Sequence, residues 1–283
     1  MSWFRRAAVL PVLQLSGVIG AASPLRSGLT LASTAGAIER AFTMSKLPGV
    51  AVVINSPGGS PVQSHLIFRR IRALAQERRK RVHVFCEDVA ASGGYFLALA
   101  GDEIYADPST VVGSIGVISA GFGLEKAIDK LGITRRVHTA GANKGALDPF
   151  LPEQPEQIAR LTAIQREIHD AFIAIVKDRR AGRLKGPDSE LFSGAFWSAR
   201  QALDLGLIDG LDDVLSRMRA TYGERVRLVP VALARPGLLS RLRRLPGLMP
   251  IGSGTDGSEA GYSLAEDALG AIEARAMWGR YGL

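Results

Sequence analysis

The chain has 283 residues, of which 47% are hydrophobic and 22% are charged. This composition is typical of a folded globular protein and excludes a disordered or collagen-like chain. The net charge of +8 and the pI near 10 raise nucleic acid and anionic membranes as candidate partners. No nucleic-acid-binding motif accompanies the basic residues, so we expect no nucleic-acid partner.

The positive charge gathers in two segments. The first, residues 69–81, has no interleaved aromatic residues, and we interpret it as a solvated basic helix face. The second, residues 235–245, alternates arginines with leucines. That pattern suits peripheral contact with a membrane surface.

Cys86 is the only cysteine in the chain. An intrachain disulfide and a zinc site built from thiolates are therefore excluded. Because it lies in the apolar run Val82–Cys86, we interpret it as a small buried hydrophobe.

The N-terminal residues imitate a signal peptide, with Arg5 and Arg6 followed by an apolar run through Ile19. Polar residues, a glycine and a proline interrupt that run, so we interpret residues 12–19 as a first buried strand. No stretch of 18 or more apolar residues occurs. The sequence therefore predicts no membrane-spanning helix and favours a cytoplasmic location or one peripheral to the membrane.

Strand-like and helix-like patterns alternate over the first 140 residues. Val50–Asn55 is a continuous apolar run that ends at Ser56-Pro57-Gly58-Gly59, which is typical of a buried strand before a tight turn. A helix is predicted over Ser60–Arg79 from the spacing of Val62, Leu66, Ile71, Leu74 and Ala75. Further strands are predicted over Val82–Cys86, Glu103–Ala106 and Val117–Ser119, and a buried helix over Ala90–Ala100. This alternation predicts parallel crossovers and an α/β fold.

A long helix is predicted over Pro152–Arg180, with acidic residues in its first turns. Its apolar stripe comprises Ile158, Leu161, Ile164, Ile168, Phe172, Ile175 and Val176. Residues 246–262 are linker-like, and a last helix is predicted over Ser263–Trp278. We expect one catalytic domain over residues 10–235 and a basic, linker-containing helical extension over residues 236–283.

Ser92 is a candidate nucleophile. It lies in Ala91-Ser92-Gly93-Gly94-Tyr95, between a predicted strand and the start of a helix. There the Gly93 N–H can face the same space as the serine hydroxyl and stabilise an oxyanion. The motif alone is more typical of a helix cap than of a nucleophile, because serine is common at that position.

The Gly58-Gly59 turn leaves backbone N–H groups free at the carboxyl end of a strand. It lacks the Gly-Lys-Ser/Thr of a phosphate-binding loop. We interpret it as an oxyanion donor or a clamp for the substrate backbone, against the alternative of an ordinary turn.

The base is not obvious from composition. None of the four histidines, His65, His83, His138 and His169, lies in a recognisable motif. Chain order alone does not exclude a Ser-His-Asp triad.

Five motifs in one order carry a family resemblance. They are Asn55-Ser-Pro-Gly-Gly, Ala91-Ser-Gly-Gly-Tyr95, Gly113-Ser-Ile-Gly-Val117, Lys144 with Asp148-Pro-Phe150, and Phe196-Trp-Ser198 through Gly206-Leu-Ile-Asp209. Over roughly residues 12–215 they resemble the signal peptide peptidase A (SppA) family of serine proteases. The resemblance implies a ClpP/crotonase-like fold with repeated ββα-type units. It also implies that Ser92 is the nucleophile, Lys144 its general base, and Ser114 the residue that holds the lysine amine.

A lysine base makes a physical demand on its surroundings. An ordinary lysine has a pKa near 10.4, so only about one in a thousand is neutral at pH 7.4. A lysine base therefore needs a desolvating pocket with little negative charge. Taken alone, Asn143-Lys144-Gly145 is typical of a surface turn, and only the resemblance favours a catalytic role.

The resemblance also implies partners and substrates. Family members form rings in which serine and lysine come from neighbouring subunits, so we expect a homo-oligomeric ring with shared active sites. Many members carry an N-terminal transmembrane anchor, which we do not expect here. The expected substrates are extended apolar peptides, such as cleaved signal peptides or membrane-protein fragments, and no cofactor or metal is implied. The alternatives are a crotonase-type acyl-CoA enzyme and a catalytically silent scaffold in which Ser92 caps a helix.

Overall fold

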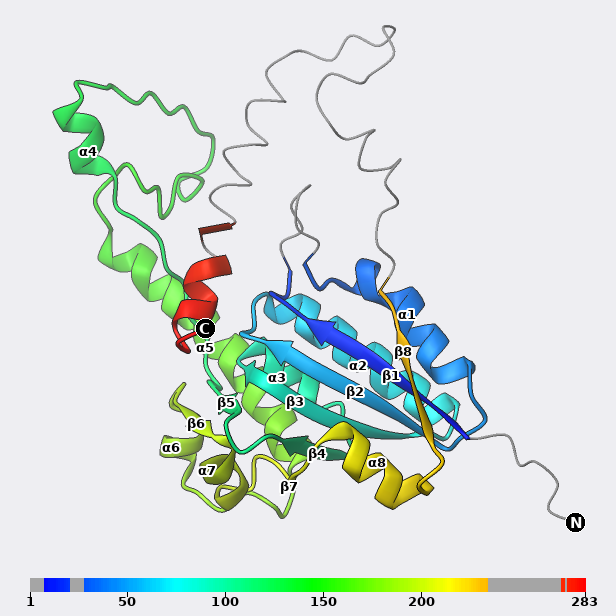
Figure 1. Ribbon diagram of the computed structural model, residues 1–283. Coiled ribbons are helices and arrows are strands. Elements are labelled where there is room, and N and C mark those ends of the chain that lie inside the picture. Colours follow the sequence, from blue (N-terminus) through cyan, green and yellow to red (C-terminus); the bar gives the residue numbers. More distant parts are fainter. Residues whose placement is uncertain (1–7, 21–27, 234–270, 273) are drawn as a thin grey trace, which may run out of the picture.

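The computed structural model describes residues 8–20, 28–233, 271–272 and 274–283 (Figure 1). The strands are β1 (Val9–Ser16), β2 (Gly49–Ser56), β3 (Arg81–Ala91), β4 (Glu103–Ala106), β5 (Val111–Gly113), β6 (Phe196–Ser198), β7 (Gly210–Leu211) and β8 (Arg227–Val231). The helices are α1 (Leu31–Thr43), α2 (Pro61–Glu77), α3 (Gly93–Ala98), α4 (Glu125–Lys130), α5 (Pro155–Arg179), α6 (Asp188–Leu191), α7 (Ala199–Asp204) and α8 (Val214–Tyr222).

The strands form one mostly parallel sheet in the order β6-β5-β3-β2-β1-β8. β3 branches this sheet, because its first half pairs with β4 and its last residues, Val89–Ala91, pair with β5. Among the described strands, only β6 runs antiparallel to its neighbour, which is β5. The α/β class is therefore confirmed, and the carboxyl ends of β2, β3 and β5 meet at one edge of the sheet.

Both faces of the sheet are buried. Along β1, Leu13 and Leu15 pack into the larger core with α1 and α2, while Leu10 and Val12 pack on the opposite face near Met218 of α8. Figure 1 shows α1, α2 and α3 on one side of the sheet and α8 on the other. Coverage on both sides explains why the central strands are continuous apolar runs rather than alternating ones.

Most elements of the first half are confirmed. The N-terminal run is a strand between β2 and β8, three residues earlier than predicted. α2 begins at the Ser60 cap, whose hydroxyl accepts the Gln63 N–H, and continues through Pro61. Glu103–Ala106 is a strand with the predicted bounds.

Two local predictions are wrong. Residues 117–119 form no strand, because the chain leaves the sheet there, and the neighbouring strand is Val111–Gly113 instead. The predicted helix over residues 90–100 is shorter, because β3 extends to Ala91 and α3 begins only at Gly93. The boundary between strand and helix therefore falls on Ser92.

The basic residues near α2 combine ion pairs with exposure to solvent. Arg70, Arg72, Arg78 and Arg81 form ion pairs with Glu39, Asp102, Glu77 or Glu103. Lys80 is buried, and its ammonium donates to the Ser45 carbonyl at 2.6 Å. The prediction of a solvated basic face is confirmed for Arg69, Arg78, Arg79 and Arg81, which are exposed, but not for Arg72 and Lys80.

Cys86 is buried as predicted, and desolvation raises the pKa of its thiol to about 12. Within the described ranges, no helix is both long and apolar enough to cross a membrane. The second basic cluster and the predicted linker lie outside the described residues. Residues 271–272 and 274–279 are helical, and the start of that predicted helix also lies outside them.

Candidate active site

Ser92 occupies the junction between β3 and α3 in a strained conformation. Its φ of 53° and ψ of −121° are rare for a residue with a side chain. Such a conformation costs about 1–3 kcal/mol and persists only where the surroundings impose it. Here the Ser92 N–H donates to the Gly113 carbonyl at 2.7 Å, and its own carbonyl accepts the Phe96 N–H at 2.9 Å.

The side chain of Ser92 makes no capping hydrogen bond to α3, although the residue stands at the N-cap position. The interpretation of this serine as an ordinary helix cap is therefore wrong. A strained serine at a strand-to-helix turn, with its hydroxyl free of the helix, is the arrangement expected of a nucleophile.

Three glycines surround this serine because no larger residue fits. A Cβ on Gly58 would lie 2.8 Å from Ser92 Cβ, and one on Gly59 would lie 2.0 Å from the Ile19 carbonyl oxygen. A Cβ on Gly93 would lie 2.5 Å from Ser64 Oγ. The Gly58-Gly59 turn and the turn at Ser92-Gly93 can therefore approach each other closely only because these three positions are glycine.

Two N–H groups beside Ser92 have no acceptor within the described part of the chain. The bridge between Ile19 and Gly59 uses the Gly58 carbonyl and the Ser60 N–H, which leaves the Gly59 N–H outside it. The Gly93 N–H stands in the first turn of α3, where helix donors lack intrahelical partners. The Gly58 N–H differs, because it donates to Ser56 Oγ at 3.2 Å. Gly59 and Gly93 are thus the available pair of donors.

Ser114 lies next to this centre, directly after β5. The last pair of the β3–β5 ladder joins Ala91 to Gly113, so Ser92 and Ser114 follow neighbouring strand ends. Ser114 is buried, and it also has a positive φ of 53°. Its N–H donates to the Ala195 carbonyl at 2.7 Å. The structure therefore brings Ser92, Ser114 and the three glycines together.

An apolar cavity of about 340 Å³ opens beside Ser92. One wall comes from the start of α2, including Val62 and Leu66, and the other from the middle of α5, including Ile168 and Phe172. Val62 and Leu66 were predicted on α2 by helical spacing, yet they are exposed, whereas Ile71, Leu74 and Ala75 are buried. The apolar periodicity of α2 therefore serves both the cavity and the core.

Sequence reasoning missed several residues of the cavity lining. His65, Phe96, Ala171 and Val117 also line it, and His65 packs against Phe96 with ring centroids 5.8 Å apart. The available signals were Val62 and Leu66, one turn apart on the helix after the glycine turn, and the apolar stripe on α5 that contains Ile168, Phe172 and Ile175.

Two arginines at the end of α5 fix the helix that forms the second wall. The guanidinium of Arg180 is buried and donates to the Gly206 carbonyl at 2.8 and 2.9 Å and to Asp209 at 2.8 Å. Arg179 donates to the carbonyls of Leu99 and Gly101, both at 2.9 Å, just after α3. The Arg179 bonds tie α5 to the end of α3, and the Arg180 bonds tie it to the segment that follows α7.

Lys144 does not join the other predicted residues within one chain. It is exposed in a turn, where its N–H donates to the Gly141 carbonyl at 3.1 Å, and it is not among the residues that line the cavity. That turn belongs to an arm, residues 118–154, which carries α4 and extends away from the sheet in Figure 1.

The arm has internal structure of its own. The Leu124 N–H donates to the Pro149 carbonyl at 2.6 Å, Arg135 pairs with Asp148, and the Arg135 guanidinium lies 4.6 Å from the centre of the Phe150 ring. These contacts explain locally why Asp148-Pro149-Phe150 accompanies the lysine. The three residues hold the turn that contains Lys144 against the start of α4.

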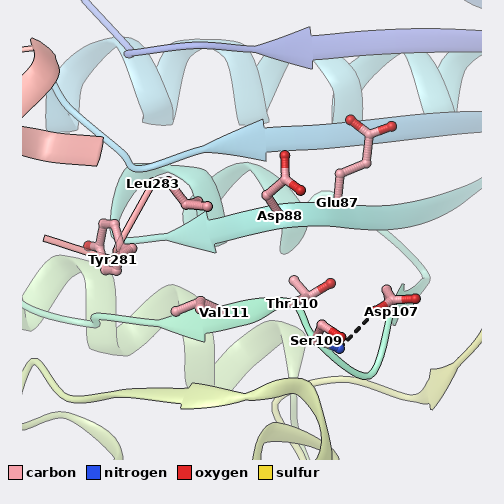
Figure 2. Close-up of a pocket in the computed structure, with 8 residues that line it drawn as sticks. All are labelled: Glu87, Asp88, Asp107, Ser109, Thr110, Val111, Tyr281 and Leu283. Atoms are coloured by element: carbon pink, nitrogen blue, oxygen red, sulfur yellow. Dashed lines mark hydrogen bonds between the residues drawn. The ribbon is translucent and has the colours of Figure 1, made fainter. Parts of the chain in front are cut away.

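A second, open cavity of about 680 Å³ lies along β3 and β5 (Figure 2). It is lined by Glu87, Asp88, Asp107, Ser109, Thr110, Val111, Tyr281 and Leu283. Burial, with the nearby charge of Asp88, raises the pKa of Glu87. Because this acidic cavity contains neither Ser92 nor the two available N–H donors, the candidate nucleophile belongs to the apolar cavity.

Comparison with known proteins decides the family. Residues 74–223, more than half of the chain, match Peptidase family S49. The chain belongs to peptidase family S49. The matched S49 residues include Ser92, Ser114 and Lys144, whereas Gly58 and Gly59 precede them.

Several S49-like relatives carry protease names. A putative signal peptide peptidase SppA of Enterococcus faecium is 29% identical over 60% of this chain and 50% of its own length. A putative protease of Synechocystis is 34% identical over 59% of each protein. A Brucella melitensis protein named Na(+)/H(+) antiporter NhaA is 54% identical over 97% of this chain, which corresponds to 37% of the Brucella protein.

This chain spans between about a third and three fifths of the length of these relatives. The antiporter name describes the whole Brucella protein, most of which has no counterpart here, so it is not transferred. Membership in S49, together with the similarity to SppA- and protease-named relatives, places this chain in the SppA family of serine proteases, which has a ClpP-like α/β fold.

Proposed function

We propose that this S49 peptidase is an endopeptidase that uses a Ser/Lys dyad of Ser92 and Lys144 to cleave extended apolar peptides. The observation that carries the proposal is the strained Ser92, which faces an apolar cavity beside two N–H groups without acceptors. We further propose that residues 10–235 form the peptidase domain and residues 236–283 an extension to it.

The proposed reaction has two steps. Ser92 Oγ attacks the peptide carbonyl carbon while the neutral lysine amine takes the hydroxyl proton, and the Gly59 and Gly93 N–H groups bind the resulting oxyanion. The lysine then protonates the leaving amine, and an acyl-enzyme forms on Ser92. A water molecule, deprotonated by the same amine, releases the acid and restores the serine.

Lys144 needs a second copy of the chain to act as this base. It is exposed on the arm, whose surface also exposes Phe122, Leu131 and Leu151 by 81%, 72% and 57%. Packing this apolar arm on a neighbouring subunit would bury the lysine and favour its neutral form. We therefore propose a homo-oligomeric ring in which Lys144 and Ser114 meet across each interface.

The cavity beside Ser92 supports the preference for apolar peptides. Its walls are mostly aliphatic and aromatic, and Val62 and Leu66 stand at its exposed side. Such a cavity favours a buried apolar side chain next to the scissile bond. Cleaved signal peptides and membrane-protein fragments offer such sequences, and we propose them as substrates.

The same cavity argues against an acyl-CoA enzyme of the crotonase type. That chemistry needs acid/base carboxylates at the reacting carbon. Within the described residues, no Asp or Glu lines the cavity beside Ser92. A non-catalytic scaffold is likewise disfavoured, because it would have no need of the strained Ser92 backbone.

Labelling with a fluorophosphonate probe tests the proposal. Wild-type protein should be labelled on Ser92, Ser92→Ala should not be labelled, and Lys144→Ala should be labelled at least about a hundredfold more slowly at neutral pH. The matched control is Ser109→Ala, an exposed serine elsewhere on the molecule that should leave labelling unchanged. Labelling that persists in Ser92→Ala would refute the proposal.

A further inference from the structure

A histidine outside the proposed dyad joins the segment just before the arm to α5, the helix that follows the arm, by a hydrogen bond. His169 Nε2 lies 3.1 Å from the carbonyl oxygen of Ile115. Because a carbonyl only accepts, Nε2 must carry the proton in this bond. Ile115 lies just before the chain departs into the arm, and His169 lies on α5, by which the chain returns.

The backbone that this histidine holds is the turn that carries Ser114. The positive φ of Ser114 is costly and must be imposed from outside. On one side the Ser114 N–H donates to the Ala195 carbonyl, and on the other the Ile115 carbonyl accepts from His169. The next residue, Gly116, is so close to Gly194 that a Cβ on it would lie 3.1 Å from the Gly194 Cα. The turn is therefore held from two sides by different elements.

This turn also reaches the nucleophile and the cavity. Gly113, just before Ser114, accepts the Ser92 N–H at 2.7 Å. The immediate neighbour of His169 on α5, Ile168, lines the cavity together with Val117. A shift of the turn relative to α5 would thus move the lysine-holding serine and one cavity wall together.

We infer that His169 is a positioning residue, which holds the Ser114 turn against α5 and keeps the lysine-binding side of the site aligned with Ser92. This inference rests on the proposed Ser/Lys mechanism. It assigns His169 no proton transfer, because its donor nitrogen is bound to a backbone carbonyl. Its contribution passes through Ser114.

Two variants of matched length separate positioning from simple packing. In His169→Gln the amide nitrogen reaches close to the place of Nε2 and can still donate, whereas His169→Met has a similar length and no donor. Kinetics with an apolar peptide substrate, the pH dependence of kcat/KM and the thermal midpoint are measured on the assembled full-length chain. If the Met variant does not fold, His169→Ala replaces it in the same comparison.

The expected result is that His169→Met lowers kcat by about five- to tenfold while KM changes less than about threefold. The acid limb of its pH profile should move to higher pH, since a misplaced Ser114 stabilises the neutral lysine less. His169→Gln should retain most of kcat and the wild-type profile, with a similar thermal midpoint in both variants.

Two outcomes overturn the inference. One is a Met variant with wild-type kcat and pH profile, and the other is an equal loss in the Met and Gln variants. Either result, obtained while labelling of the wild type still depends on Ser92 and Lys144, leaves the proposed function intact. Labelling independent of Ser92 would instead remove the proposed function itself.

Discussion

The glycine turn before α2 packs directly against the backbone at Ser92 and Gly93. Gly58 has a φ of +106°, and the position where its Cβ would lie is 2.9 Å from the Gly93 nitrogen and 2.8 Å from Ser92 Cβ. A side chain there would meet both the nucleophile and a proposed oxyanion donor. The absence of a Cβ at Gly58 is therefore a requirement of the site as well as of the turn.

We predict that Gly58→Ala abolishes most of the reactivity of Ser92. The positive φ should destabilise the fold by about 1–3 kcal/mol, and the clash should slow fluorophosphonate labelling by at least about tenfold. Gly17→Ala is the matched control, because Gly17 has a φ of +114° but no atom within 4 Å of an added Cβ. It should lose similar stability and keep its labelling rate. Wild-type labelling in Gly58→Ala would contradict the prediction.

At the scale of elements, the sequence predicted those helices and strands whose apolar pattern is complete within the segment itself. β2, β4 and α2 follow from apolar runs and from helical spacing, and the structure confirms them. The prediction of a strand over Val117–Ser119 was wrong, because a β-branched run becomes a strand only if a partner strand is within reach. The chain instead pairs Val111–Gly113 with β3 and then leaves the sheet.

The residues of the candidate site likewise divide into those that the sequence predicts and those that it does not. Ser92 and Gly59 stand where strands end, so their proximity follows from the parallel sheet. His169 carries no local signal, since its contact with Ile115 depends on how α5 returns to the body. The stripe on α5 was predicted as one apolar face, but only Phe172 and Val176 in its last third are buried. Periodicity does not reveal whether such a face meets its own core or another subunit.

A buried histidine links three elements on the amino side of the sheet. His83 of β3 lies within hydrogen-bond distance of Glu103 in β4, at 3.1 Å, and of the Tyr222 hydroxyl in α8, at 2.9 Å. Burial lowers the pKa of His83 despite the opposing effect of Glu103, with Arg81 lowering it further and Asp102 opposing. The neutral ring is therefore the form that the folded state prefers.

We predict that this contact makes the fold acid-sensitive. The folded-state pKa of His83 lies below the ordinary histidine value of 6.5. The contribution of His83 to the free energy of unfolding is therefore fully present above pH 6.5 and declines as the pH falls toward the folded-state pKa. Urea unfolding at pH 7.5 and 5.5 should show a larger loss of unfolding free energy in wild type than in His83→Gln, which cannot titrate. Equal losses in the two proteins would contradict the assignment.

At the scale of the whole molecule, one chain carries all the proposed parts of a site without assembling them. Ser92, Ser114 and the glycine donors lie at one sheet edge, while Lys144 lies on an exposed arm with unburied apolar side chains. Large exposed apolar side chains gathered on one projecting segment are typical of an interface. Activity should then depend on how many copies are joined and in what combination.

We predict that two inactive variants restore each other. Co-expressed Ser92→Ala and Lys144→Ala chains with different affinity tags, purified through both tags, should regain about one quarter of wild-type activity if subunits mix randomly and each site takes its serine and lysine from different chains. The control pairs Ser92→Ala with Ser114→Ala. Because these two serines follow adjacent strands of the same chain, no site in that mixture is intact, and it should stay inactive. Recovery in the control, or none in the first mixture, would show that the dyad is not divided between chains in this way.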